Sequence, residues 1–400
     1  MVKRLLILVP VFAISPVLAL PIIYKLINKQ SVVAQTMLAF FMALCAIITP
    51  ILPDLDSFRH MMMYNEFVNY PLSLVYFIQG HKDYALYILA GLFAVIGIPF
   101  EWLIGFFMFI SYMLAFAIYR SLIARRSDIA NNSHLNLMCF GSFFLSVQFL
   151  FIATGLRSGT SCLMMAYAWV LLRDFKFIKC IVFAALSVCT HFFSWCFVPV
   201  LLIYIFLRRH KNIVLSNKVV LVLIIVLIGL GTKVLSFMIG LLSEESLQTV
   251  GAGDGTMEYY AGDSGGDLNY SELSIFGKLG FAIERLPLIY ACYLLLFKLK
   301  NWQATYEKTF AFCLILVVSM FLPFFIPMQR ISWLVTPILL YLIFENMQIG
   351  ESRMCIKGLF LTCILSNIML IYSYAVVFWG TPFYYLLMPI NYVLSYRCTL

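Results

Sequence analysis

The chain has 400 residues, of which 63% are hydrophobic and only 11% are Asp, Glu, Lys or Arg. A soluble domain carries about a quarter charged residues, so this composition excludes a water-soluble globular surface. The formal net charge of +9 must therefore lie mainly in the loops that join apolar segments of a membrane protein.

Apolar segments follow one another along the whole chain and predict membrane-spanning helices. A helix needs about 20 apolar residues to cross a bilayer. We therefore expect an all-α polytopic membrane protein with about 11–13 transmembrane or re-entrant helices, in a single integral membrane domain over residues 1–400. The clear segments are 5–24, 32–52, 101–119, 135–153, 157–172, 219–242, 276–297, 309–327, 331–346 and 357–379.

Two further apolar segments do not have the length of one span. Residues 84–98 are followed by Pro99 and would form only about 22 Å of helix, so we expect them to enter the membrane without crossing it. Residues 180–207 are too long for one span and too short for two full ones. We expect a tight hairpin there, with its tip at the outer face.

The distribution of basic residues supports this topology. With the N-terminus outside, 17 of the 27 Lys and Arg residues fall on the inner side, among them Arg120, Arg125 and Lys176. This is the asymmetry that the positive-inside rule requires. If 84–98 crossed the membrane fully, every later loop would violate the rule. The short segment 53–83 and the loop 243–275 then lie on the outer side.

The loop 243–275 is the one sizeable hydrophilic segment. It contains seven acidic residues and neither Lys nor Arg. A loop of this length is usually functional or disordered. Its tyrosines, including Tyr259 and Tyr260, predict a lid that stacks on sugar rings, although disorder would explain its glycines equally well.

Several ionisable residues are expected at one depth near the outer face, although they are far apart in sequence. Ionisable groups at membrane depth are costly and are candidates for function. Each also has a structural interpretation, such as neutralising a neighbour, anchoring at lipid headgroups or packing among aromatic rings. The candidates are Asp56, Arg59, Arg157, His191, Arg285 and Arg330.

Separated arginines at one membrane surface suit a doubly charged anionic ligand. One guanidinium group can donate hydrogen bonds to two phosphate oxygens at once. A departing pyrophosphate also needs fixed positive charge to stabilise it. The membrane supplies such ligands as polyprenyl-pyrophosphate sugars. Asp54 and Asp56 are spaced like a metal-binding DxD pair, but two carboxylates alone are a weak signal. The eleven cysteines form no CxxC pair, so neither a zinc site nor a disulfide framework is predicted.

Short motifs at these positions resemble the bacterial O-antigen and capsular polysaccharide polymerases, the Wzy-like and EpsG-like group. The segment from Asp56 to Tyr64 resembles an early Gly-x-Asp-x-x-x-Tyr element, with the glycine replaced and a longer gap. Leu156-Arg157-Ser158-Gly159 followed by Ala166 is similar to an LRQ-x-x-A element, with Ser158 in place of glutamine. Thr190-His191-Phe192 and Gln329-Arg330 are similar to the group's later histidine and arginine elements.

The resemblance implies a GT-C-like fold and transfer of a growing chain from undecaprenyl pyrophosphate onto a new lipid-linked repeat unit, at the periplasmic face of the bacterial inner membrane. It implies a glycosyltransferase without metal or other cofactor. Arg157 and Arg330, with Arg59 or Arg285, would bind the pyrophosphate. Asp56 or His191 would orient or deprotonate the acceptor hydroxyl. A chain-length regulator protein is a candidate partner besides the lipid bilayer, and no nucleic acid is expected.

Other functions fit the same sequence features less well. One alternative is a transferase that uses a polyprenyl-monophosphate sugar and a metal at Asp54 and Asp56, and another is an O-antigen ligase. A flippase for lipid-linked repeats should line a central cavity with charge, whereas Lys233 is the exception among nearly uncharged mid-span positions. A purely structural subunit would not explain arginines gathered at one face.

Overall fold

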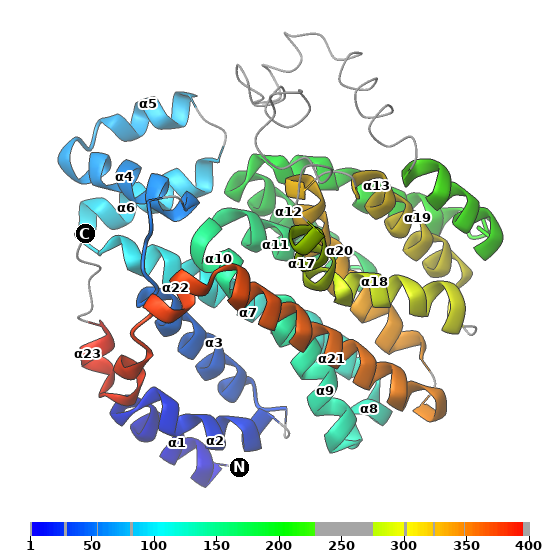
Figure 1. The fold of residues 1–400 in the computed structure, drawn as a ribbon, viewed down its shortest axis with the longest axis horizontal. Helices are drawn as coiled ribbons and strands as arrows, with labels where there is room; N and C mark the ends of the chain where they lie inside the picture. The colour runs from blue at the N-terminus through cyan, green and yellow to red at the C-terminus, as the bar shows by residue number, and fades with distance from the viewer. Residues whose placement is uncertain are drawn as a thin grey trace. The chain divides into compact units, whose positions relative to one another are not determined.

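In the computed structural model, the described residues are 2–27, 30–53, 55–80, 83–228, 275–299, 302–322, 325–347 and 349–394 (Figure 1). Helices make up the regular structure of this part of the chain, and it contains no strand. The all-α class is therefore confirmed. The helices pack into two compact units, residues 1–191 with 367–400 and residues 192–366, which are described separately below.

The first unit contains the N-terminal helices and the C-terminal segment. Its α3 and α7 pack along one another, and α7 and α12 both pack against α11. The last part of α21 (Ile349–Ser373) also belongs to it. Its other helices are α1 (Val2–Ile14), α2 (Pro16–Ile27), α3 (Val32–Ile47), α4 (Asp56–Asn69), α5 (Ser73–Gly80), α6 (Tyr84–Ile96), α7 (Phe100–Arg125), α8 (Ser127–Asn131), α9 (Ser133–Ser146), α10 (Phe149–Gly155), α11 (Arg157–Arg173), α12 (Phe177–Thr190), α22 (Ala375–Gly380), η3 (Phe383–Leu387) and α23 (Ile390–Leu394).

The second unit is built mainly around α13, α18, α19 and α20, with α13 packed on α19 and both α18 and α19 packed on α20. Its α17 and α18 are separated by a bend of 59° at Arg285. The helices are η1 (Phe192–Phe197), α13 (Val198–Arg209), a helix over Asn217–Ile228, α17 (Ile275–Glu284), α18 (Leu286–Tyr293), the π-helix η2 (Leu294–Lys298), α19 (Thr305–Phe321), α20 (Phe325–Asn346) and the first part of α21.

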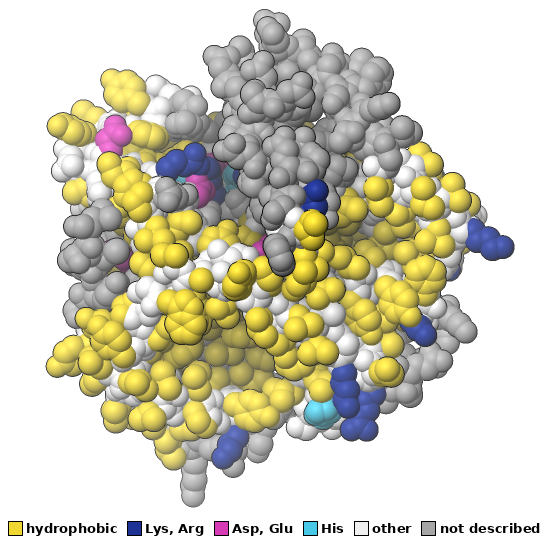
Figure 2. Space-filling model, viewed as in Figure 1, with side chains coloured by type: hydrophobic (Ala, Val, Ile, Leu, Met, Phe, Trp, Pro, Cys, Tyr) yellow, Lys and Arg dark blue, Asp and Glu magenta, His cyan; other side chains and the backbone are white. Residues whose placement is uncertain are grey.

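The chain is a multi-pass membrane protein. Four of the described helices are long and apolar enough to cross a membrane, and a fifth span results if the bent pair around Arg285 is one span. The four are Phe100–Arg125, Ser133–Gly155, Phe192–Arg209 and Arg353–Ser373. Further apolar helices of 10–17 residues, including α3, α6 and α12, overlap other predicted segments. Figure 2 shows apolar side chains over much of the visible face, as a lipid-facing surface requires.

Neither segment of unusual length forms one long helix; that 84–98 enters the membrane without crossing it and that 180–207 is a hairpin stay predictions. The helix α6 has 13 residues and ends where Gly97 adopts a left-handed conformation, two residues before Pro99. The segment 180–207 breaks at His191, between α12 and η1. The predicted span 5–24 is also broken, because Pro16 disfavours helical geometry at Ser15 and α2 starts anew after it.

Small residues bring α3 and α7 close together in the first unit. A Cβ atom on Gly105 of α7 would lie 2.7 Å from Cγ1 of Ile47 and 3.3 Å from the carbonyl oxygen of Ala43, both on α3. On its other side α7 contacts α11, where the hydroxyls of Ser111 and Thr160 lie 2.8 Å apart. This packing fixes α7 and α11 relative to one another, and both helices carry polar groups at their ends.

Gly105→Val should separate α3 from α7. The added side chain has no room against Ile47 and the Ala43 backbone, so we expect a loss of about 1–3 kcal/mol in stability and a lower melting temperature of the purified protein. The control is Gly155→Ala, where a Cβ meets no atom within 4 Å. Equal melting temperatures for Gly105→Val and the parent protein would show that α3 and α7 are not held this closely.

Candidate functional site

A cluster of charged and histidine side chains lies at one end of the helices of the first unit. We call it the Arg157 cluster. It is contributed by the start of α4, the residue before α6, the start of α11 and the residue after α12. Figure 2 shows basic, acidic and histidine side chains gathered in one place among apolar ones. The members are Asp56, Arg59, His60, Asp83, Arg157 and His191.

Asp83 joins Arg157 to His191 within the cluster. One of its carboxylate oxygens accepts a hydrogen bond from Nη1 of Arg157, and the other lies 3.3 Å from Nδ1 of His191. The side chains of Arg157, Asp83 and His191 are only 16%, 11% and 10% exposed. Tyr87 of α6 also hydrogen-bonds with Arg157. A carboxylate that contacts both a guanidinium and an imidazole fixes the position of each.

Asp56 forms the second part of the cluster. It accepts a hydrogen bond of 3.1 Å from Nε of Arg59, and its other oxygen lies 3.3 Å from Nε2 of His60. That oxygen is also 4.0 Å from Nε of Arg157, so the two carboxylates flank the same guanidinium. Arg59 is 73% exposed and therefore lies at the rim, whereas His60 is buried.

The electrostatic environment keeps Asp56 ionised. Burial alone would raise the pKa of Asp56, but contact with His60, the charge of Arg157 and the hydrogen bond from Arg59 outweigh it and hold the pKa below its usual range. For His60, burial is the main cause of a lowered pKa, and the charge of Arg157 adds to it. His60 is consequently neutral at neutral pH, and Asp56 is an anion with little tendency to accept a proton.

The backbone around Arg157 explains how it reaches this position. Leu156 has a φ of 50°, although it is a buried branched residue, and it separates α10 from α11. A non-glycine residue in this region costs about 1–2 kcal/mol, so the surrounding packing must enforce it. The kink makes Arg157 the first residue of α11, which is where the sequence predicted that a helix begins.

The structure brings together four of the predicted site residues, Asp56, Arg59, Arg157 and His191. Arg285 and Arg330 belong to the second unit. There Arg285 is buried at the bend, pairs with Glu284 at 2.7 Å and lies over the ring of Phe281. Arg330 lies over the ring of Phe193, 4.9 Å from its centroid. Tyr259, Tyr260 and Asp54 lie outside the described residues, so the lid stays a prediction and the weak DxD signal stays untested.

Asp83 and His60 were not among the site residues predicted from the sequence. Asp83 ends the polar segment 53–83 and directly precedes an apolar helix, and this position was the available signal. An acidic residue there could equally stand at the solvent-exposed start of a helix without any functional role, since Asp is common at such positions. Nothing local in the sequence pairs it with Arg157, which is 74 residues away.

Comparison with known protein families matches residues 36–392 to the family described as the EpsG family. The match covers nearly the whole chain, and the chain belongs to the EpsG family. This confirms the resemblance drawn from the motifs and supports a polysaccharide polymerase role in the broad sense. No curated protein and no solved structure matches the chain.

Asp83→Ala should destabilise the first unit. It would leave the guanidinium of Arg157 without its main partner in a site that is mostly buried, and breaking such a pair costs about 3–5 kcal/mol. The measurement is thermal unfolding of the purified protein. Glu66→Ala, which removes an exposed carboxylate from α4, serves as the control and should have little effect.

A double-mutant cycle with Arg157→Gln tests the pair directly. The two substitutions together should cost less than the sum of the single ones. Each single substitution leaves one charged group buried without its partner, whereas the double variant removes both groups. Additive losses would contradict a direct interaction between Asp83 and Arg157.

Proposed function

We propose that this member of the EpsG family is a glycosyltransferase that polymerises oligosaccharide repeat units carried on undecaprenyl pyrophosphate, forming O-antigen or capsular polysaccharide at the periplasmic face of the bacterial inner membrane. The observation that supports it best is the Arg157 cluster. A partly buried guanidinium stands there between two carboxylates and beside a histidine, at one end of membrane helices. These are groups that can bind a phosphate, hold sugar hydroxyls and accept a proton.

In this proposal Arg157 binds the pyrophosphate of the donor. Charge accumulates on the pyrophosphate as the glycosidic bond breaks, and a fixed guanidinium stabilises that charge. A phosphate oxygen would compete with or join Asp83 at the guanidinium. Arg59, at the exposed rim, and Arg330 and Arg285, in the second unit, are the further cations proposed to contact the pyrophosphate. The tyrosines Tyr259 and Tyr260 are proposed to cover the sugars.

His191 is the better candidate for the general base. Histidine is the side chain that most often transfers protons in catalysis, and Asp83 at 3.3 Å from Nδ1 would hold one tautomer. The lowered pKa of Asp56 makes that carboxylate a weak proton acceptor. Asp56 is therefore proposed to orient the acceptor hydroxyl and to position Arg157.

The proposed step is a single displacement. The acceptor hydroxyl oxygen attacks the anomeric carbon of the growing chain while the bond from that carbon to the pyrophosphate oxygen breaks. The hydroxyl proton passes to His191, and undecaprenyl pyrophosphate leaves with the bonding electrons. Attack opposite the leaving group inverts the anomeric configuration. The step is balanced without a metal or other cofactor. Its partners are the lipid-linked oligosaccharide and the bilayer, together with a chain-length regulator protein.

Arg157→Ala should abolish chain extension, with a rate loss of at least about a hundredfold, because the developing pyrophosphate charge loses its guanidinium. The measurement is a lipopolysaccharide or capsule gel from a strain lacking the gene and carrying the variant. We expect the ladder to collapse to carrier plus a single repeat. Arg209→Ala, which removes an exposed charge at the end of α13, is the control and should restore the full ladder. Normal-length chains from Arg157→Ala would contradict the assignment.

The two candidate bases can be distinguished by kcat and KM of the purified enzyme, from rates measured over a range of substrate concentrations. His191→Gln should lower kcat by about a hundredfold or more, whereas Asp56→Asn should mainly raise KM for the lipid-linked repeats. The reverse pattern would make Asp56 the base. Loss of all surface repeats in the gene-deletion strain would instead indicate a flippase or ligase.

A further inference from the structure

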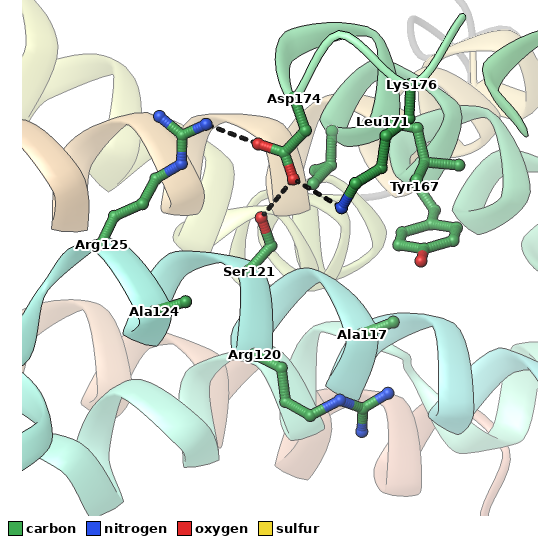
Figure 3. Close-up of a pocket in the computed structure, with 10 residues that line it drawn as sticks. Ala117, Arg120, Ser121, Ala124, Arg125, Tyr167, Leu171, Asp174 and Lys176 are labelled. Atoms are coloured by element: carbon green, nitrogen blue, oxygen red, sulfur yellow. Dashed lines mark hydrogen bonds and ion pairs between the residues drawn. The ribbon is translucent and has the colours of Figure 1, made fainter.

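A pocket of about 300 Å³ lies in the first unit, between the ends of α7 and α11 (Figure 3). It is distinct from the Arg157 cluster, and no residue of that cluster lines it. Its polar lining consists of Arg120, Ser121 and Arg125 from α7 and Tyr167 and Asp174 from α11 and its C-terminal cap. Lys176 completes it from the turn that leads to α12.

The pocket has an excess of positive charge. Asp174 lies 2.5 Å from Arg125 and 3.6 Å from Lys176, and it accepts a hydrogen bond from Ser121 (Figure 3). This one carboxylate cannot neutralise three cations. Arg120, on the other side of the pocket, is instead held by a hydrogen bond of 2.6 Å to the buried amide oxygen of Gln35 on α3. The lining is therefore preorganised for an anion.

Apolar side chains beside the pocket indicate a lipid environment. Phe175, Phe177 and Ile178 surround Lys176 in sequence and are 66%, 53% and 81% exposed. Exposed apolar side chains next to a basic residue are typical of a segment at the level of lipid headgroups. Phe175 adopts a φ of 59°. The backbone N–H of Lys176 donates a hydrogen bond to the carbonyl oxygen of Leu171, which closes the turn that carries Lys176.

The pocket and the Arg157 cluster lie at opposite ends of α11. This helix has 17 residues, about 25 Å of length, which is close to the thickness of a bilayer core. The end of α11 with the pocket carries the basic residues that the positive-inside rule assigns to the cytoplasmic side. Anionic lipids are enriched there, and basic pockets between helices on that side bind their headgroups.

We propose that this pocket binds the phosphate-bearing headgroup of an anionic phospholipid of the cytoplasmic leaflet. Arg120 and Lys176 contact the phosphate from two sides, and Arg125, with Asp174, forms the back of the site. The volume suits a headgroup, while the acyl chains lie along the exposed apolar face of α12. The site is independent of the chemistry proposed for the Arg157 cluster.

The experiment measures binding of fluorescent phosphatidylglycerol to the purified full-length protein in detergent. Arg120→Gln with Lys176→Gln should weaken binding about tenfold or more, since each basic residue near the surface adds substantially to the affinity for anionic lipid. The control is Lys179→Gln, which removes an exposed charge from the same segment without lining the pocket, and its affinity should equal that of the parent. Arg120→Lys with Lys176→Arg should retain binding.

Soluble probes separate the lipid from a free anion. Inorganic phosphate and phosphatidylcholine should each compete weakly with phosphatidylglycerol. Strong competition by inorganic phosphate would overturn the lipid assignment in favour of a soluble phosphate ligand. Unchanged affinity in the double variant would overturn the site itself. If the double variant does not fold, as judged by its melting temperature, Lys176→Gln alone tests the site, because this side chain is 54% exposed; equal affinity of that variant and the parent would then overturn the proposal.

Discussion

The ion pair between Asp83 and Arg157 is the interaction on which this end of the first unit depends. A guanidinium that is mostly removed from water is tolerated only with a paired anion, and Asp83 supplies it. Because Asp83 also contacts His191, the same carboxylate ties the start of α11 to the residue that ends α12. Asp56 approaches the guanidinium from α4 and completes its surroundings. The position of each candidate catalytic group therefore depends on the others.

Breaks in the helices coincide with the functional candidates. Leu156 separates α10 from α11 just before Arg157, His191 follows α12, and Arg285 lies at the bend between α17 and α18. A regular helix in lipid satisfies its backbone internally and presents apolar side chains, so it offers no place for a charged group. A break at the end of a span releases that constraint. It also costs backbone energy, as the positive φ of Leu156 illustrates.

The helix α11 connects two sites of different character. The Arg157 cluster is nearly charge-balanced, with two carboxylates against two guanidiniums and a neutral His60. The pocket at the opposite end has three cations and one carboxylate. A charge-balanced site suits neutral sugars, and it suits an anion that replaces a carboxylate at the guanidinium. A site with excess positive charge suits an anionic lipid headgroup that remains bound. Tight packing of α7 on α3 and α11 holds both ends in place.

The sequence by itself determined the class of this protein and the ends of several helices. Its apolar runs, its basic asymmetry and its short motifs predicted an α-helical membrane protein of the EpsG-like group, a helix that begins at Arg157 and a break at His191. These features follow from local composition and from proline and charge positions. Only the tertiary structure decided which polar groups meet. Asp83 contacts Arg157, 74 residues away in sequence, and His191, 108 residues away. Such contacts depend on how the helices pack against one another. The local sequence does not specify this packing, because many apolar side chains have similar sizes.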